Sequence, residues 1–140
     1  MAFEDQIVAK LEADAAVSAL VGARIYPAPA PQDVLSPFLT YQVVGSDQAG
    51  SSYSARAVFD ISTLQIDCWH EQIDRVSDGA SHFYGAVSVL SRAVRTALDR
   101  QGDPTGADAI DGIQFTDWYD LSDEQHARRV CRFDIYVRDP

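Results

Sequence analysis

The chain contains four residues of the types that bind a catalytic zinc ion or activate a water molecule: Cys68, His70, Glu71 and His126. Thiolate and imidazole are the ligands that zinc prefers, and a glutamate beside zinc-bound water can act as a general base. The letters HEQID begin at His70 like the metalloprotease motif H-E-x-x-H, but Asp74 stands where the second histidine is required. A small metal-dependent hydrolase is therefore an alternative hypothesis for this chain.

The spacing of these residues argues against a zinc site. One residue separates Cys68 from His70 and four separate His126 from Cys131, which differs from the ligand spacing of zinc knuckles. Both cysteines lie on the apolar sides of alternating stretches, and free cysteine is among the most buried residue types. We predict two core thiols, a polar helix start at HEQID, no enzymatic activity, and no metal or other cofactor.

Composition and charge set limits on the class of protein. The 140 residues are 46% hydrophobic, which is enough for one domain spanning 1–140. Acids outnumber bases 21 to 11, giving a formal net charge of −10. This excess argues against tight binding to a phosphate backbone but is compatible with a channel that DNA only passes through. The acidic start lacks the features of a signal peptide and no apolar run is long enough for a membrane, so we expect cytosolic synthesis.

Hydrophobic periodicity predicts the helices. Residues 3–13 show a helical stripe, and Asp14 is placed to cap a further short turn that ends at Gly22. A second stripe predicts one long helix of about 27 residues. Its apolar positions step by three and four, at Ile73, Val76, Ala80, Phe83, Val87, Leu90, Val94 and Ala97.

Alternation of apolar and polar residues predicts four strands, at 38–44, 61–69, 110–119 and 129–138. The order is α-β-β-α-β-β. We predict an α+β fold with a four-stranded, mostly antiparallel sheet and both helices packed on one face. The other face is expected to carry Trp69, Arg132, Tyr136 and Arg138.

Two polar segments are candidates for contacts. Residues 45–58 form a predicted long loop, in which Gln48, Tyr53 and Arg56 are candidate assembly residues because Tyr and Arg are frequent at interface hot spots. Together with Trp69, Arg132 and Tyr136 they make up the predicted assembly interface. The acidic, aromatic stretch 117–124 is predicted to be a solvated hairpin end, with a contact surface as the alternative.

Several segments, taken in order, resemble the tail terminator (tail completion) family of long-tailed bacteriophages and phage-like gene transfer agents. They follow the N-terminal helix and read LVGARIYP, a proline-rich spacer, PFLTYQVVG, LQIDCWHE before the long helix, VRTALD at its end, and RFDIYVRD. We interpret GARIYPAPAP as a rigid strap that fixes the N-terminal helix against the sheet.

The resemblance implies a function as well as an α+β fold. Such proteins form a hexameric ring on the head-proximal end of a tail tube, where the ring ends tube polymerisation and offers a joining surface. The implied partners are further copies of the chain, the tail tube protein and a head or neck connector. DNA passes through without sequence-specific binding, the location is the virion tail, and no membrane or cofactor is involved.

Two alternatives besides the hydrolase remain open at this point. A head-tail connector or neck protein would differ from a tail terminator in what it binds, the portal side and not the tail tube. A free-standing peptide-binding adaptor domain would be a stable monomer with a concave apolar site.

Overall fold

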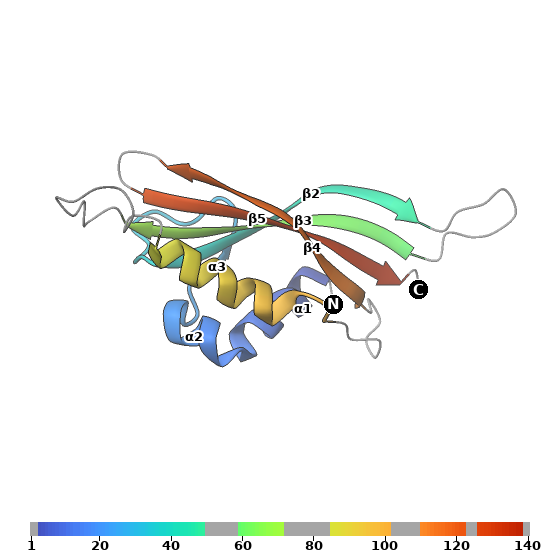
Figure 1. The fold of residues 1–140 in the computed structure, drawn as a ribbon, viewed down its shortest axis with the longest axis horizontal. Helices are drawn as coiled ribbons and strands as arrows, with labels where there is room; N and C mark the ends of the chain where they lie inside the picture. The colour runs from blue at the N-terminus through green and yellow to red at the C-terminus, as the bar shows by residue number, and fades with distance from the viewer. Residues whose placement is uncertain (1–2, 50–58, 72–84, 102–109, 123–125, 139–140) are drawn as a thin grey trace, which may run out of the picture.

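A computed structural model describes residues 3–49, 59–71, 85–101, 110–122 and 126–138. In this part of the chain, three helices lie against one face of a five-stranded mixed sheet (Figure 1). The elements are α1 (Phe3–Ala13), α2 (Ala15–Val21), β1 (Ile25–Pro27), β2 (Phe38–Ala49), β3 (Phe59–Glu71), α3 (Gly85–Leu98), β4 (Ile110–Ser122) and β5 (His126–Arg138).

The sheet has the strand order β1-β2-β3-β5-β4. β1 runs parallel to β2, and the other neighbours are antiparallel. The predicted α+β class is confirmed, and so is the placement of the helices on one face. The predicted count of four strands is wrong, because a fifth strand lies in the segment expected to be only a spacer.

The short turn predicted after Asp14 is the complete helix α2. The carboxylate of Asp14 accepts hydrogen bonds from the backbone N–H groups of Ala16 and Val17, at 3.0 and 3.1 Å. Gly22 follows the helix with φ of 58°, a left-handed conformation that favours glycine. These two residues fix where α2 begins and ends.

The strap contains the strand that the sequence did not predict. Ile25–Pro27 pairs with Leu39–Tyr41, over a length too short to show alternation. Arg24 explains how this segment is held: its Nε donates to the carbonyl of Pro37 at 2.9 Å and its Nη2 to that of Leu20 at 3.3 Å. One side chain thus joins the end of α2 to the start of β2, while the predicted fixing of the N-terminal helix α1 by the strap stays a prediction.

The hairpin strands β2 and β3 are longer than predicted. β2 continues through a bulge between Val43 and Gly45 as far as Ala49, so 45–49 is strand rather than loop, while 50–58 lies outside the described residues. β3 includes His70 and Glu71, so the predicted helix start at HEQID is wrong there. Main-chain pairing continues in both strands where side-chain alternation is too weak to reveal it.

The predicted long helix is described only in its second half. α3 begins at Gly85, and its apolar residues Val87, Leu90 and Val94 are buried as the stripe predicts. The earlier positions of the stripe, Ile73, Val76, Ala80 and Phe83, lie outside the described residues. In the described chain, no helix is both long and apolar enough to cross a membrane.

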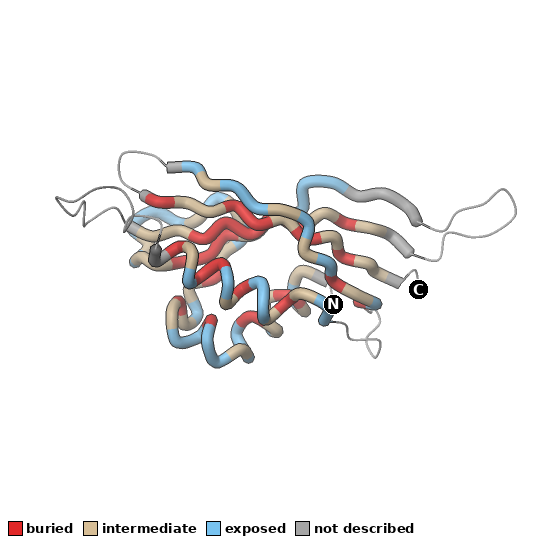
Figure 2. Tube along the Cα trace, viewed as in Figure 1, coloured by how far each residue is buried: buried red, intermediate tan, exposed pale blue. Residues whose placement is uncertain are grey.

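The core lies between the helices and the covered face of the sheet (Figure 2). Leu64, Ile66 and Cys68 of β3 lie in it beside Cys131, Phe133 and Ile135 of β5, together with apolar residues of all three helices. Both cysteines are free and buried, which confirms the predicted core thiols. The predicted inward and outward sides of β3 and β5 are therefore correct.

Candidate assembly interface

The face of the sheet opposite the helices is called the open face here, since no described helix covers it (Figure 1). Trp69 pairs across the sheet with Arg128, Gln65 with Arg132, and Ile61 with Tyr136. Directly paired residues share one face of a sheet. The predicted interface residues Trp69, Arg132 and Tyr136 therefore all lie on the open face, along β3 and β5.

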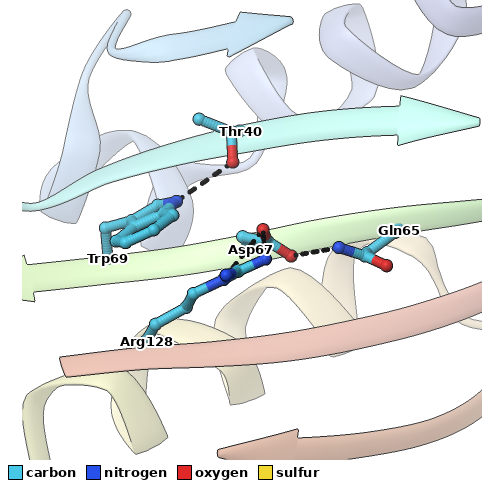
Figure 3. A network of polar contacts seen from close by, with 5 residues as sticks. All are labelled: Thr40, Gln65, Asp67, Trp69 and Arg128. Carbon is cyan, nitrogen blue, oxygen red and sulfur yellow. Dashed lines mark hydrogen bonds and ion pairs between the residues drawn. The ribbon is translucent and has the colours of Figure 1, made fainter. Parts of the chain in front are cut away.

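A buried carboxylate, Asp67 of the middle strand β3, lies on this face (Figure 3). Asp67 is only 3% exposed although no helix covers it. Arg128 donates to its Oδ2 from Nε and Nη2 at 3.0 and 2.6 Å, and Gln65 Nε2 donates to its Oδ1 at 3.0 Å. The charge of Asp67 is thus balanced within the face itself.

Trp69 completes this network. The Arg128 guanidinium lies 4.9 Å from the centroid of the Trp69 ring, and the indole N–H donates to Thr40 Oγ1 at 3.0 Å (Figure 3). The ring is also stacked on Phe38, with centroids 5.7 Å apart. Trp69 therefore has a structural role on the open face, whatever it contacts outside the chain.

Burial and the cation act on Asp67 in opposite directions. Burial raises the pKa of this carboxyl, and the charge and hydrogen bonds of Arg128 lower it, with burial the larger effect. The net result is a raised pKa. Arg128 thus offsets only part of the cost of keeping this carboxylate charged.

A second Arg–carboxylate pair lies nearer the edge of the sheet. Arg132 donates from Nε to Asp117 Oδ1 at 2.7 Å and from Nη2 to the other oxygen. This hydrogen bonding lowers the pKa of Asp117, which is far more exposed than Asp67. Arg132 also lies 5.8 Å from the Tyr119 ring centroid, and the Tyr136 hydroxyl donates to Gln114 Oε1 at 3.2 Å.

The stretch predicted to be a solvated hairpin end is largely part of strand β4. Asp117 and Asp120 are not free acids, because each is paired with an arginine of β5. A bulge between Phe115 and Asp117 shifts the alternation of β4. As a result Tyr119 and Leu121, which are 40% and 45% exposed, face the open side. Neither residue was among the predicted interface residues, although both lie in the stretch 117–124 whose alternative interpretation was a contact surface.

The three loop candidates are not brought onto this face by any described contact. Gln48 belongs to β2 and pairs with Asp60, but its side chain is not described. Tyr53 and Arg56 lie outside the described residues. Arg138 ends β5, and its side chain is likewise not described.

The described residues do not support the hydrolase hypothesis. Cys68 is fully buried, and its interaction with Cys131, followed by burial, raises the pKa of its thiol. Glu71 pairs with His126 at the end of the β3–β5 ladder, with side chains that are not described. No group of three or more potential metal ligands occurs among the described His, Cys, Asp and Glu residues.

Comparisons with known proteins give a family and a fold that this chain is similar to. Residues 5–138 match the family model described as Tail completion protein gp17. A chain from the "Virion of native gene transfer agent (GTA) particle" has the same fold, with a TM-score of 0.71 and 20% sequence identity. That match covers 95% of this chain and 92% of the other. Among curated proteins, none is similar enough in sequence to count as a match.

Proposed function

We propose that this chain, which belongs to the Tail completion protein gp17 family and is a structural component of a virion tail, caps the head-proximal end of the tail tube. It does so as a hexameric ring made of copies of itself. The ring ends tube polymerisation and presents a joining surface to the head or neck connector. DNA passes through the ring without sequence-specific binding, and the protein catalyses no reaction.

The open face is the observation that carries this proposal. On this sheet surface, the exposed Tyr119 and Leu121 lie beside two arginine–aspartate ion pairs. Because Arg128 and Arg132 already have carboxylate partners, a docking protein does not have to neutralise them. Aromatic and arginine side chains are enriched at protein interfaces. We assign the contacts with tail or neck partners to this face, including the predicted residues Trp69, Arg132 and Tyr136.

Charge supports the proposed passage of DNA. The chain has a net charge of −10, and two of its eleven bases are engaged with carboxylates on the open face. Phosphate binding needs clusters of available Lys and Arg. A ring of such subunits would repel DNA and not retain it.

The test is polymerisation of the purified tail tube protein of the same particle, with increasing amounts of this chain. We expect shorter tubes that carry one additional ring at one end in electron micrographs. Unchanged tube lengths and bare ends would contradict the proposal. Binding to the head-side connector with no effect on tubes would favour the neck-protein alternative, and a monomer that binds neither would favour an adaptor domain.

A further inference from the structure

A basic pocket lies on the helix side of the molecule, between α3 and the strands β5 and β4, of which β4 is the edge of the sheet. Its volume is about 220 Å³, and it is lined mainly by Ser88, Ser91, Arg92, Arg95, Trp118 and Arg129. Three of the eleven bases of a strongly acidic chain therefore meet at one concave site. This concentration of positive charge contrasts with the open face, where cations are paired.

The cations of the pocket are not equally engaged. Arg129 forms an ion pair with Asp120 and lies 4.1 Å from the Trp118 ring centroid. Arg95 lies over Phe115, with 4.2 Å between its guanidinium and the ring centroid. Both Arg92 and Arg95 are exposed, and neither has a carboxylate partner in the described part of the chain. The pocket thus has two positive charges available for a ligand with carboxylates.

Among the described residues, α1 carries most of the carboxylates that have no partner, and Asp33 is a further one. Asp5 and Glu12 are exposed and seven residues apart, so they lie on one side of that helix. Neither has a hydrogen-bond or ion-pair partner among the described residues. Five further described carboxylates are engaged: Asp14 caps α2, Asp67, Asp117 and Asp120 pair with arginines, and Asp99 accepts the N–H of Phe115.

The basic pocket and the acidic side of α1 are separate parts of the surface, because no residue that lines the pocket belongs to α1. α3 packs on β3, β5 and β4, and the pocket includes Phe115 and Trp118 of the edge strand β4. α1 packs on α2 and α3, with its Ile7 and Leu11 in the core, and the exposed Asp5 and Glu12 belong to its outer side. A ring needs two different complementary patches on each subunit, and these two patches meet that requirement.

We propose that the basic pocket of one copy of this chain binds the acidic side of α1 of the next copy. Arg92 and Arg95 pair with Asp5 and Glu12 across the contact, which repeats around the ring. This inference rests on the proposed ring and assigns its subunit contact. The open face then stays available for tail and neck partners.

The test exchanges the charges of the two patches. One variant carries Arg92→Glu with Arg95→Glu, and the other carries Asp5→Lys with Glu12→Lys. Each variant alone has two patches of like charge, so we expect self-association at least roughly tenfold weaker than in the wild type at low salt. An equimolar mixture restores both complementary pairs and should form rings in which the two variants alternate. Molar mass is measured by light scattering, and thermal unfolding checks that each variant folds.

The control is Arg100→Glu, which reverses an exposed charge outside the pocket and should associate like the wild type. Wild-type association of the Arg92→Glu/Arg95→Glu variant would overturn the inference and leave the proposed function intact. The inference would also be overturned if both variants are folded but their equimolar mixture does not regain self-association. Failure of the wild-type chain to form rings, alone or on tail tubes, would instead count against the proposed function and remove the basis of the inference.

Discussion

The covered face and the open face of the sheet are built from the same strands but are stabilised in different ways. On the covered face, Leu64 and Phe133 are fully buried against helices and other apolar side chains. On the open face, Asp67 is almost as inaccessible but is surrounded by Arg128, Gln65 and Trp69. The covered face is stabilised mainly by removing apolar surface from water, and the open face by pairing polar groups. A sheet with one covered face is enough for folding, which leaves the other face available for assembly.

The largest effect on stability is expected from truncation on the covered face. Phe133 is fully buried and its ring lies 5.5 Å from that of Phe115. Phe133→Ala should lower the free energy of unfolding by about 3–5 kcal/mol, because it leaves a cavity in a packed core. Urea denaturation measures this loss. Leu121→Ala on the open face is the control and should cost about 1 kcal/mol or less; equal losses would mean that both faces are packed as core.

A smaller loss is expected where a buried charge loses its partner. Arg128→Ala leaves Asp67 without its cation, and we expect a loss of about 1–3 kcal/mol at neutral pH. Because the folded-state pKa of Asp67 is raised, ionisation of this group lowers stability as the pH rises through that pKa. Arg128 limits the cost of the charged Asp67. The loss of unfolding free energy in Arg128→Ala should therefore shrink as the pH falls and Asp67 takes up a proton. A loss that does not change with pH would show that Arg128 acts through packing alone.

The smallest effect is expected at the exposed pair of the open face. Hydrogen bonds from Arg132 lower the pKa of Asp117, so this pair contributes stability above the ordinary pKa of aspartate and loses it as the pH falls. Asp117→Asn should therefore lower the melting temperature slightly at neutral pH and leave it unchanged at acidic pH. High salt should reduce the difference, since exposed pairs are screened. A larger loss than in Arg128→Ala would contradict the assignment of the exposed and buried pairs.

Parts of the fold with strong side-chain periodicity were predictable from the sequence. The alternation of β5 placed Cys131, Phe133 and Ile135 in the core, and the described half of the helical stripe was correct. β1 was missed because three residues show no alternation, and the ends of β2 and β3 because main-chain pairing leaves no side-chain pattern. These errors changed the strand count and the assignment of His70 and Glu71, but not the fold class.

The candidate interface was predictable only where alternation alone determines the face. This was sufficient for Trp69, Arg132 and Tyr136. The Asp67–Arg128 pair depends on the register between strands that are 61 positions apart, which one sequence does not reveal. Tyr119 and Leu121 were missed because a bulge in β4 decides which of its residues face the open side.

The proposed assembly role of the open face is tested most directly by placing a charge on it. Leu121→Glu introduces a carboxylate at an exposed position of that face, and Leu35→Glu is the matched control at a position 73% exposed between β1 and β2. Tube length and end-capping are measured by electron microscopy, with melting temperature as the check on folding. We predict that Leu121→Glu keeps the wild-type melting temperature within a few degrees and no longer caps tubes, whereas Leu35→Glu caps them normally. Normal capping by folded Leu121→Glu protein would contradict the assignment of assembly to the open face.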